Sequence, residues 1–309
     1  MKLNLKNVLW MVVLPILLAT GCSEEEKYVG LRVPSAQASN KVCRDSLPIY
    51  RRHKDAPLKI LAIGNSFTNC ATANLPRFIK YINGDSLCFA KLVLSGSSLS
   101  MHWANHRDNV SCYEMTYADD GGFVDTDIKT IDEALAVMDW DIIVVQQVSG
   151  LSGDYSSYQP YLSFLCTLFV ESNPDVMTAW HSTWAYMPGT EHPDFYRYGY
   201  DPEAMYAAIQ GATQRACTDS DIDLMIPSGT LIKRLREAFP DVEDGFAPDG
   251  YHIDMSNMAA YALSALWYEV LVHPFTGTSS LESPLLLANV GPENIDRVEE
   301  IINTLIENP

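Results

Sequence analysis

Short apolar segments rich in β-branched residues alternate with helix-like segments along this 309-residue chain, and this alternation limits the fold more than any other feature. The clearest segment is Asp141–Val145, whose Ile-Ile-Val-Val run is apolar on both faces, as a central strand of a parallel sheet must be. The pattern predicts one α/β domain with a mostly parallel sheet and helices on both faces. Further strands are predicted over Leu58–Ile63, Phe89–Leu94, Val176–Ala179 and Leu224–Ile226, and helices over Leu75–Ile82, Thr130–Met138, Tyr161–Glu171, Pro202–Cys217, Leu231–Phe239, Met255–Val272 and Ile295–Ile306.

The N-terminus has the features of an export signal. Two lysines in Met1–Lys6 precede the apolar stretch Val8–Ala19, which is too short to span a bilayer comfortably. The Cys22 that follows Ala-Thr-Gly resembles a bacterial lipoprotein cleavage site. The sequence therefore predicts a lipoprotein signal peptide over residues 1–22, with lipid on Cys22. The alternative is an ordinary signal peptide with an incidental cysteine.

An acidic run, Ser23-Glu24-Glu25-Glu26, follows the predicted lipidation site. It resembles the tag that sends some lipoproteins to the outer face of the outer membrane, and it opens a tether over residues 23–56. We therefore expect a cell-surface protein that meets the membrane through its lipid anchor only. A solvated linker on a periplasmic-facing anchor is the alternative. The formal net charge of −18 argues against nucleic acid as a partner, because phosphate binding needs Lys and Arg.

The cysteines do not form a recognisable metal or redox motif. No Cys-x-x-Cys spacing occurs, so zinc and thioredoxin-like sites are not indicated. An exported protein can oxidise its cysteines, and six of them allow 15 pairings, but in a domain of this size they can equally be small buried residues. The six that follow Cys22 are Cys43, Cys70, Cys88, Cys112, Cys166 and Cys217.

A serine lies directly after the first predicted strand, in Gly64-Asn65-Ser66-Phe67-Thr68. Gly64 permits the tight strand-to-helix turn that exposes a nucleophile, and the helix that follows aims N–H groups at developing negative charge. The alternative is an ordinary strand-ending turn, in which Gly, Asn and Ser are common. A phosphate-binding loop is excluded, because no Gly-Lys-Ser/Thr follows at the required spacing.

An acid and a base occur together near the other end of the chain, in Pro248-Asp249-Gly250-Tyr251-His252. One loop can present both side chains, so that the imidazole accepts the proton of Ser66 while the carboxylate holds its other nitrogen. The alternative is a polar loop that leads into the helix at Met255–Val272, with Asp254 as its N-cap. If Ser66 and His252 meet at one edge of the sheet, the chain carries an activated nucleophile.

Three places can supply donors to an oxyanion, each after a predicted strand. They are the backbone N–H of Ser66, the backbone N–H of Gly96, and the side chain of Gln146 or Gln147. Because the carboxyl ends of parallel strands share one edge of the sheet, these groups are expected to lie close together. For the glutamines, simple polar termination of a strand is the alternative.

These motifs together resemble the SGNH/GDSL hydrolase superfamily over about residues 57–272. The likeness is greatest to an uncharacterised branch with a GNSFT-type signature, a Trp-Asp strand that leads to a Gln, and a Thr-Trp-Ala-Tyr segment. Trp140-Asp141 and Thr183–Tyr186 match the last two features.

The resemblance implies a flavodoxin-like three-layer α/β/α sandwich over residues 57–309. It implies a metal-independent, cofactor-free serine esterase with Ser66, His252 and Asp249 as its triad and Gly96 as the glycine of the second block. The sequence departs from the superfamily in having Asn65 where Asp is usual. It also lacks a Gly-x-Asn-Asp block after the Asp141 strand, where Gln146 is the nearest replacement.

Other histidines and aromatic residues carry weaker signals. His102 and His106 have the i, i+4 spacing of metal ligands, but no third ligand is evident and ordinary packing is favoured. His181, Trp184 and Tyr186 lie in the aromatic segment Trp180–Tyr200, after a strand end, and are candidates for substrate contact. Packing of the loop is the alternative.

The sequence thus predicts a serine hydrolase of O-acyl esters, with an acetyl group on carbohydrate as the favoured substrate. The last step depends on resemblance and surface location, not on any residue. Two alternatives remain. One is a catalytically silent carbohydrate-binding lipoprotein on the same fold, and the other is a lipase or thioesterase.

Overall fold

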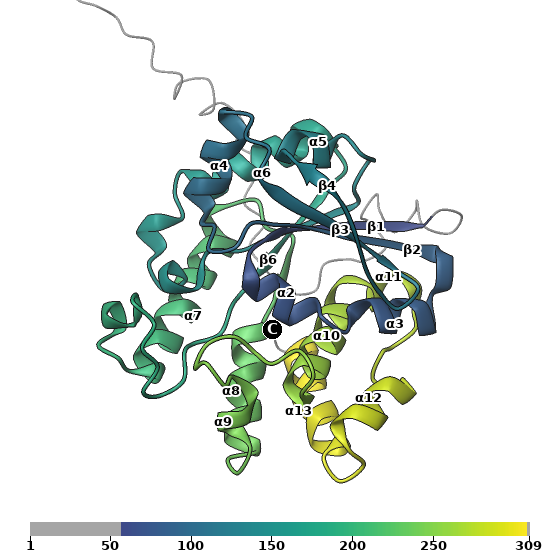
Figure 1. The fold of residues 1–309 in the computed structure, drawn as a ribbon, viewed down its shortest axis with the longest axis vertical. Helices are drawn as coiled ribbons and strands as arrows, with labels where there is room; N and C mark the ends of the chain where they lie inside the picture. The colour runs from purple at the N-terminus through teal and green to yellow at the C-terminus, as the bar shows by residue number, and fades with distance from the viewer. Residues whose placement is uncertain (1–56, 308–309) are drawn as a thin grey trace, which may run out of the picture. The chain divides into compact units, whose positions relative to one another are not determined.

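The computed structural model of the chain describes residues 57–307, so the predicted signal peptide, Cys22, the tether and Cys43 lie outside the described residues. A seven-stranded sheet in the order β4-β3-β2-β1-β5-β6-β7 forms the centre of the domain (Figure 1). The five neighbouring strands β2, β1, β5, β6 and β7 are parallel, which confirms the predicted sheet. They are β1 (Leu58–Gly64), β2 (Leu87–Val93), β5 (Ile142–Val145), β6 (Met177–His181) and β7 (Leu224–Ile226).

An antiparallel hairpin extends one edge of the sheet. Strand β3 (Tyr113–Asp119) pairs with β2, and β4 (Gly122–Lys129) pairs with β3 across a turn at Asp120 and Gly121. The sequence analysis did not predict these two strands. Their outer member, β4, is exposed along most of its length and therefore lacks the apolar run of a central strand.

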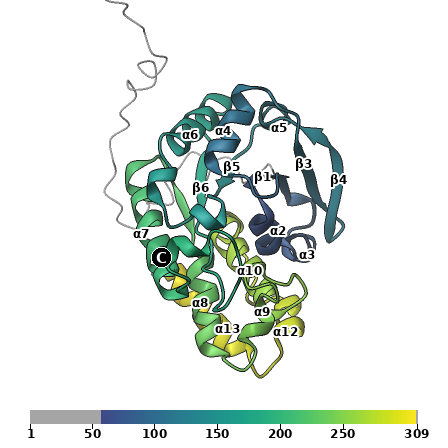
Figure 2. The ribbon, with the colours of Figure 1, turned by 60° about the vertical axis from the view of Figure 1, so that its left-hand side comes forward.

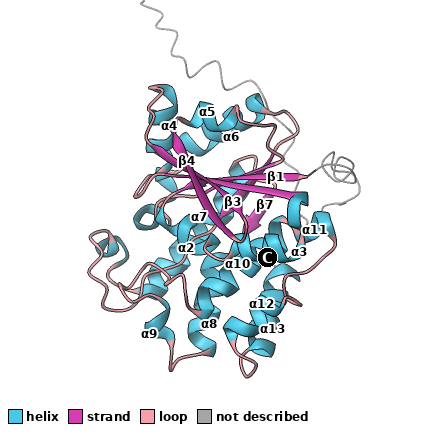
Figure 3. Cartoon of the chain, turned by 45° about the vertical axis from the view of Figure 1, so that its right-hand side comes forward, coloured by secondary structure: helices cyan, strands magenta, loops and turns pink. Residues whose placement is uncertain are grey.

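Helices cover both faces of the sheet, as predicted (Figures 2 and 3). The face with α4, α5 and α6 lies opposite the face with α2, α3, α8 and α10. The remaining helices are α7, α9, α11, α12 and α13. The bounds are α2 (Ser66–Thr72), α3 (Leu75–Ile82), α4 (Leu99–Arg107), α5 (Ile131–Leu135), α6 (Tyr161–Ser172), α7 (Pro202–Asp219), α8 (Ser228–Ala238), α9 (Glu243–Phe246), α10 (Met258–Leu271), α11 (His273–Thr276), α12 (Pro284–Val290) and α13 (Ile295–Glu307).

Strand residues alternate between two hydrophobic cores, one under each helical layer. On β1, Ile60 and Ala62 join the core that includes α10, whereas Leu61 and Ile63 join the core that includes α6. The alternation follows from the two-residue period of a strand, and it explains why central strands are apolar on both faces. The fold is therefore a three-layer α/β/α sandwich.

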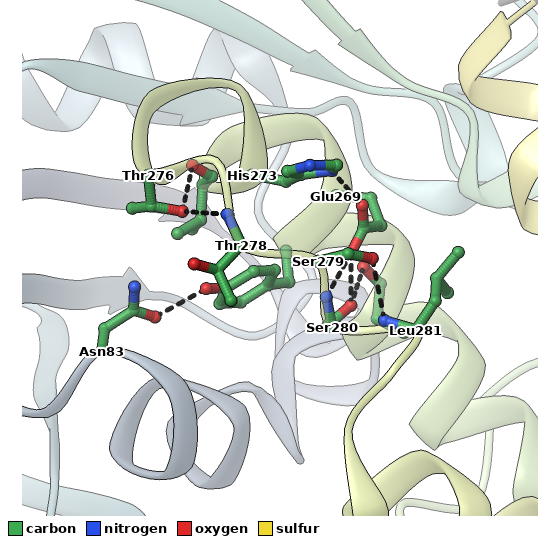
Figure 4. Close-up of polar contacts among 11 residues, drawn as sticks. Asn83, Glu269, His273, Thr276, Thr278, Ser279, Ser280 and Leu281 are labelled. Atoms are coloured by element: carbon green, nitrogen blue, oxygen red, sulfur yellow. Dashed lines mark hydrogen bonds and ion pairs between the residues drawn. The ribbon is translucent and has the colours of Figure 1, made fainter.

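Helix α10 is buried on nearly all sides, and a carboxylate near its C-terminal end holds the segment that follows it. Glu269 is 2% exposed, and its Oε1 accepts hydrogen bonds from the backbone N–H of Ser280 at 2.5 Å and from the hydroxyls of Ser280 and Ser279 at 2.8 and 2.9 Å. Its Oε2 pairs with His273 Nδ1 at 2.5 Å. We call these four residues the Glu269 cluster (Figure 4).

The cysteines of the described domain form no disulfide bond with one another. Burial raises the pKa of the thiols of Cys70 and Cys217 to about 11, and it also raises the pKa of the thiol of Cys166. All five described cysteines are free, namely Cys70, Cys88, Cys112, Cys166 and Cys217. Cys70 and Cys166 are buried and the other three are partly exposed, so the described cysteines do not form a disulfide framework.

Two smaller features complete the fold. Asn257, and not Asp254, is the N-cap of α10, since the Asn257 side chain accepts a hydrogen bond from Ala260 N. Within residues 57–307, no helix has both the length and the apolar character needed to cross a membrane.

Candidate active site

Ser66 lies at the point where β1 turns into α2. Asn65 is the N-cap of this helix, and its Oδ1 accepts the N–H of Phe67 at 3.0 Å. Gly64 is needed here because a Cβ on it would lie 2.1 Å from Thr68 Oγ1. Since β1 pairs with β2 on one side and β5 on the other, the turn lies at the switch in strand order, where open α/β sheets bind ligands.

The structure brings Ser66, His252 and Asp249 together in one hydrogen-bonded chain. His252 Nε2 lies 2.9 Å from Ser66 Oγ, and His252 Nδ1 lies 2.7 Å from Asp249 Oδ2. If Asp249 accepts the proton of Nδ1, Nε2 is left as the acceptor for the serine hydroxyl. The arrangement is that of a nucleophile, a general base and a group that orients the base.

Asp249 is held by its own loop. Its Oδ1 accepts the backbone N–H groups of His252 at 2.7 Å and of Tyr251 at 3.0 Å. Burial raises the pKa of Asp249, but these N–H groups and the imidazole outweigh that effect and leave the pKa below its usual value. The carboxylate is therefore ionised at neutral pH. Gly250 has a φ of +87°, and a Cβ there would lie 2.3 Å from Thr190 Oγ1, so the turn requires glycine.

Gly96 lies in a loop that is hydrogen-bonded to the turn that carries Ser66. Leu94 N donates to Gly64 O at 3.0 Å, and Asn65 Nδ2 donates to Ser97 O at 3.0 Å. Gly96 is exposed, has a φ of +69°, and its N–H makes no hydrogen bond within the described residues. The N–H of Ser66, as the first residue of α2, has no partner within its helix either. Both predicted backbone donors are thus available.

Comparison with known proteins gives the family. The model of a family described as "Domain of unknown function (DUF4886)" matches residues 59–280. The chain belongs to this family. A crystal structure of a DUF4886 family protein from Bacteroides uniformis is 30% identical, with a TM-score of 0.73, over 82% of this chain and 96% of that chain. No curated protein matches this DUF4886 family member in sequence.

More distant structures also match this fold. A candidate SGNH hydrolase from Slackia heliotrinireducens is 18% identical, with a TM-score of 0.48, over 69% of this chain and 98% of that one. A candidate GDSL-like lipase from Parabacteroides merdae is 11% identical, with a TM-score of 0.47, over 69% and 95%.

Gln146 does not occupy the place predicted for an oxyanion donor. Its side chain is 1% exposed, and its Nε2 donates to Asn65 Oδ1 at 2.6 Å. Its Oε1 accepts from Thr68 Oγ1 at 2.9 Å and pairs with His181 Nδ1 at 2.5 Å. The amide lies beneath the serine turn, so a direct contact with substrate is not supported. Gln147 is buried as well and bonds Leu99 N and Ser157.

The predicted substrate contacts of His181, Trp184 and Tyr186 are wrong. All three side chains are 0% exposed. Trp184 instead stacks on Phe67 with ring centroids 4.4 Å apart, and its Nε1 donates to Tyr251 O at 2.7 Å. One buried residue thus contacts both the serine turn and the acid–base loop. Spacing in the sequence could not separate packing from ligand contact, because both favour aromatic residues after a strand.

Two partly exposed rings lie near the imidazole of His252, and the sequence analysis did not predict either as part of the site. The ring of Tyr251 lies 4.4 Å from that of His252, and the ring of His192 lies 4.8 Å from that of Tyr251. Burial lowers the pKa of His192, and its Nδ1 accepts the N–H of Asp194 at 3.2 Å. Tyr251 could have been predicted, because it lies between Asp249 and His252 in the sequence. No sequence motif marks His192.

The histidines with metal-like spacing have other partners. His102 Nε2 lies 3.1 Å from Ser97 Oγ and His102 Nδ1 lies 2.9 Å from Tyr113 OH, while His106 pairs with Asp132 at 2.9 Å. Within residues 57–307, no group of three or more His, Cys, Asp or Glu side chains is placed to hold a metal ion.

Proposed function

We propose that this protein is a serine hydrolase that cleaves O-acyl esters. The observation that carries the proposal is the hydrogen-bonded chain from Ser66 Oγ through His252 to Asp249. Its 2.9 Å contact joins residues that are 186 positions apart in the sequence, and its 2.7 Å contact joins the imidazole to the carboxylate. Each component has the environment that its role requires. The serine starts a helix after a tight turn, the imidazole is partly exposed, and the carboxylate is ionised.

The mechanism follows from these positions. Ser66 Oγ attacks the ester carbonyl carbon while His252 Nε2 takes the hydroxyl proton, and Asp249 stabilises the resulting imidazolium. The N–H groups of Ser66 and Gly96 bind the oxyanion, and each such donor contributes about 10²–10³ in turnover. His252 then protonates the leaving alcohol. In the second half of the reaction, His252 activates a water molecule that releases the acid from Ser66.

The test is the reaction of the protein with a small activated acetyl ester and with a fluorophosphonate probe. Ser66→Ala should lower turnover by about 10⁶, as loss of the serine does in comparable triads, and should abolish labelling. Ser111→Ala removes an exposed hydroxyl outside the site and serves as the matched control. Hydrolysis that survives in folded Ser66→Ala protein would refute the proposal.

For the substrate, we favour an acetyl group on a carbohydrate. Resemblance and the expected surface location support this choice, and so does the loop that contacts the acid–base segment through the bond from Thr190 Oγ1 to Asp249 O. This loop leads to Tyr196 and Tyr200, whose side chains are 56% and 64% exposed. Exposed aromatic rings offer stacking faces for sugars.

Two substrates distinguish the candidate classes. Tyr200→Ala should lower kcat/KM on an acetylated oligosaccharide by about tenfold, the loss of one ring contact of about 1.4 kcal/mol, while leaving kcat/KM on the small acetyl ester unchanged. Equal effects on both would contradict the sugar contact. Preference for long acyl esters or for thioesters would indicate a lipase or thioesterase, and glycan retention without hydrolysis would indicate a binding protein.

Surface anchoring remains a proposal for the part of the chain before residue 57. A mature protein with acyl chains on Cys22 is expected, and intact mass measurement after expression in a bacterial host tests it. A mass without added acyl groups would rule out lipidation.

A further inference from the structure

Buried polar side chains form one hydrogen-bonded row beneath Ser66. The row follows the ends of four neighbouring strands, β2, β1, β5 and β6. Ser97 O accepts from Asn65 at 3.0 Å, Gln146 donates to Asn65 at 2.6 Å, and His181 lies 2.5 Å from Gln146. We call Ser97, Asn65, Gln146 and His181 the polar ladder.

The direction of each hydrogen bond in the ladder is fixed by backbone groups. Ser97 O can only accept, so the group of Asn65 that faces it is the NH₂ group. Phe67 N can only donate, so Asn65 turns its oxygen toward both Phe67 and Gln146. Gln146 must therefore donate through Nε2, which leaves its Oε1 as an acceptor.

The orientation of Gln146 in turn fixes the tautomer of His181. Because Oε1 of Gln146 accepts, Nδ1 of His181 must carry the proton. Burial lowers the pKa of His181 to about 3, so the ring is neutral and its Nε2 is a bare acceptor. That atom is buried and has no hydrogen-bond partner within residues 57–307. The ladder thus contains no charge.

The ladder contacts both sides of the serine. Asn65 precedes Ser66, and Thr68, which donates to Gln146 at 2.9 Å, follows it by two residues. Gln146 also packs close to Gly64, since a Cβ built on that glycine would lie 3.3 Å from Gln146 Cδ. The side chains of all four ladder residues are buried, so none of them is exposed to substrate. Ser97 is the ladder residue that directly follows Gly96 in the sequence.

We infer that the polar ladder positions Ser66 as an uncharged unit, in which Gln146 is a positioning residue and both Asn65 and Gln146 must be amides. The inference rests on the proposed function. It also explains the two departures from the superfamily pattern, since Asn65 donates to a carbonyl that a carboxylate would repel. Gln146 then serves the turn rather than the oxyanion.

The isosteric variant Gln146→Glu tests this inference. An ionised carboxylate cannot donate to Asn65, so two acceptors face each other and the turn shifts. A displacement of about 1 Å lowers kcat by roughly 10²-fold, and KM should stay near the wild-type value. A protonated carboxyl can donate, and burial raises its pKa. The ratio of variant to wild-type kcat should therefore rise about tenfold as the pH falls from about 8.5 to about 6.

Other ionisable groups do not confuse this readout. His181 and His102 border the ladder, and burial keeps both neutral in that range by lowering the pKa to about 3 and about 4. The pH dependence that the triad itself gives to kcat is measured in the wild-type protein, and taking the ratio divides it out. Gln147→Glu is the matched control, because it places the same charge at a neighbouring buried amide that does not touch the serine turn.

Two outcomes would overturn the inference. One is a folded Gln146→Glu protein whose kcat ratio to wild type is flat with pH or matches that of Gln147→Glu. The other is a His181 ring that carries its proton on Nε2, read from ¹⁵N shifts of labelled histidine in the wild-type protein. The nitrogen shifts do not require activity. A protein with the expected tautomer that cleaves no ester would refute the proposed function and the positioning role, but not the order of the hydrogen bonds.

Discussion

The polar ladder and the Glu269 cluster are both buried, yet one is uncharged and the other is built on a carboxylate. In the ladder, amides and a neutral imidazole bridge four strands, and each bond joins residues far apart in sequence. In the Glu269 cluster, one carboxylate accepts from residues 4 to 11 positions away. The ladder therefore joins segments of the sheet, whereas the cluster fastens one local turn.

The difference teaches that buried polarity serves two purposes in this domain. Charge-assisted hydrogen bonds are strong and suit a place where the chain needs only to be held. Neutral bonds change little with pH and suit a place beside a reaction that itself moves protons. Glu269 lies 12 residues after Asn257, the N-cap of α10, so the cluster is about 18 Å along the helix from the acid–base loop.

The largest effect on stability should come from Glu269→Ala. The change leaves the N–H of Ser280 and two hydroxyls without their acceptor, and such a loss in a buried cluster costs about 3 kcal/mol. Urea unfolding measures this loss, and kcat per folded molecule should be unchanged. Glu269→Gln keeps one acceptor and should cost less. A fall in kcat as large as that of Gln146→Glu would erase the distinction between the two regions.

Acid should weaken the sheet edge through its buried histidines. Burial lowers the pKa of His102 to about 4 and of His181 to about 3, whereas unfolded histidine titrates near 6.5. Below that value the unfolded chain binds protons that the folded protein does not. The free energy of unfolding should therefore fall by about 1.4 kcal/mol per pH unit for each ring as the pH drops from about 6.5 toward 4.

Denaturation at several pH values measures this slope. His102→Gln should remove about half of the dependence that the two rings contribute, whatever its effect on absolute stability. An unchanged slope would mean that the ring is protonated in the folded protein, contrary to the hydrogen bonds drawn for the sheet edge.

A smaller effect is expected where Trp184 joins the serine turn to the acid–base loop. Trp184→Phe keeps an aromatic ring against Phe67 but removes the N–H that holds Tyr251 O. Loss of that bond should lower kcat about fivefold, in line with a hydrogen bond worth about 1 kcal/mol. Trp140→Phe is the matched control, since it removes a buried bond of 2.9 Å to Ala134 O on the other face of the sheet. If both variants lower kcat equally, Trp184 has no special role.

The sequence predicted the central strands and the triad because both leave local signals. A run such as Ile142–Val145 needs two buried faces, and a Gly-Asn-Ser turn after a strand fixes where the serine lies. The pair of Asp249 and His252 was visible because three residues of spacing suffice for one loop to present both. Their meeting with Ser66 was implied by the resemblance to the SGNH/GDSL superfamily, and the residues alone left it open.

The rest depended on contacts that composition does not encode. Gln146 follows its strand whether it faces substrate or the turn, and only the position of Asn65 decides between them. Trp184 and Tyr200 belong to one aromatic segment, yet one is fully buried and the other is 64% exposed. Strands β3 and β4 escaped prediction because β4 is exposed along most of its length and β3 is only partly buried, so neither has the apolar run of a central strand.

The unpaired cysteines have a practical consequence for how this domain is made. Because the five thiols of residues 57–307 are free and their pKa values are raised, maturation of the described domain depends on no oxidising enzyme and is insensitive to mild reductants. The described domain therefore needs no disulfide bond to hold its fold, in a reducing or an oxidising compartment. Preparation of this domain under reducing conditions therefore needs no oxidative refolding step.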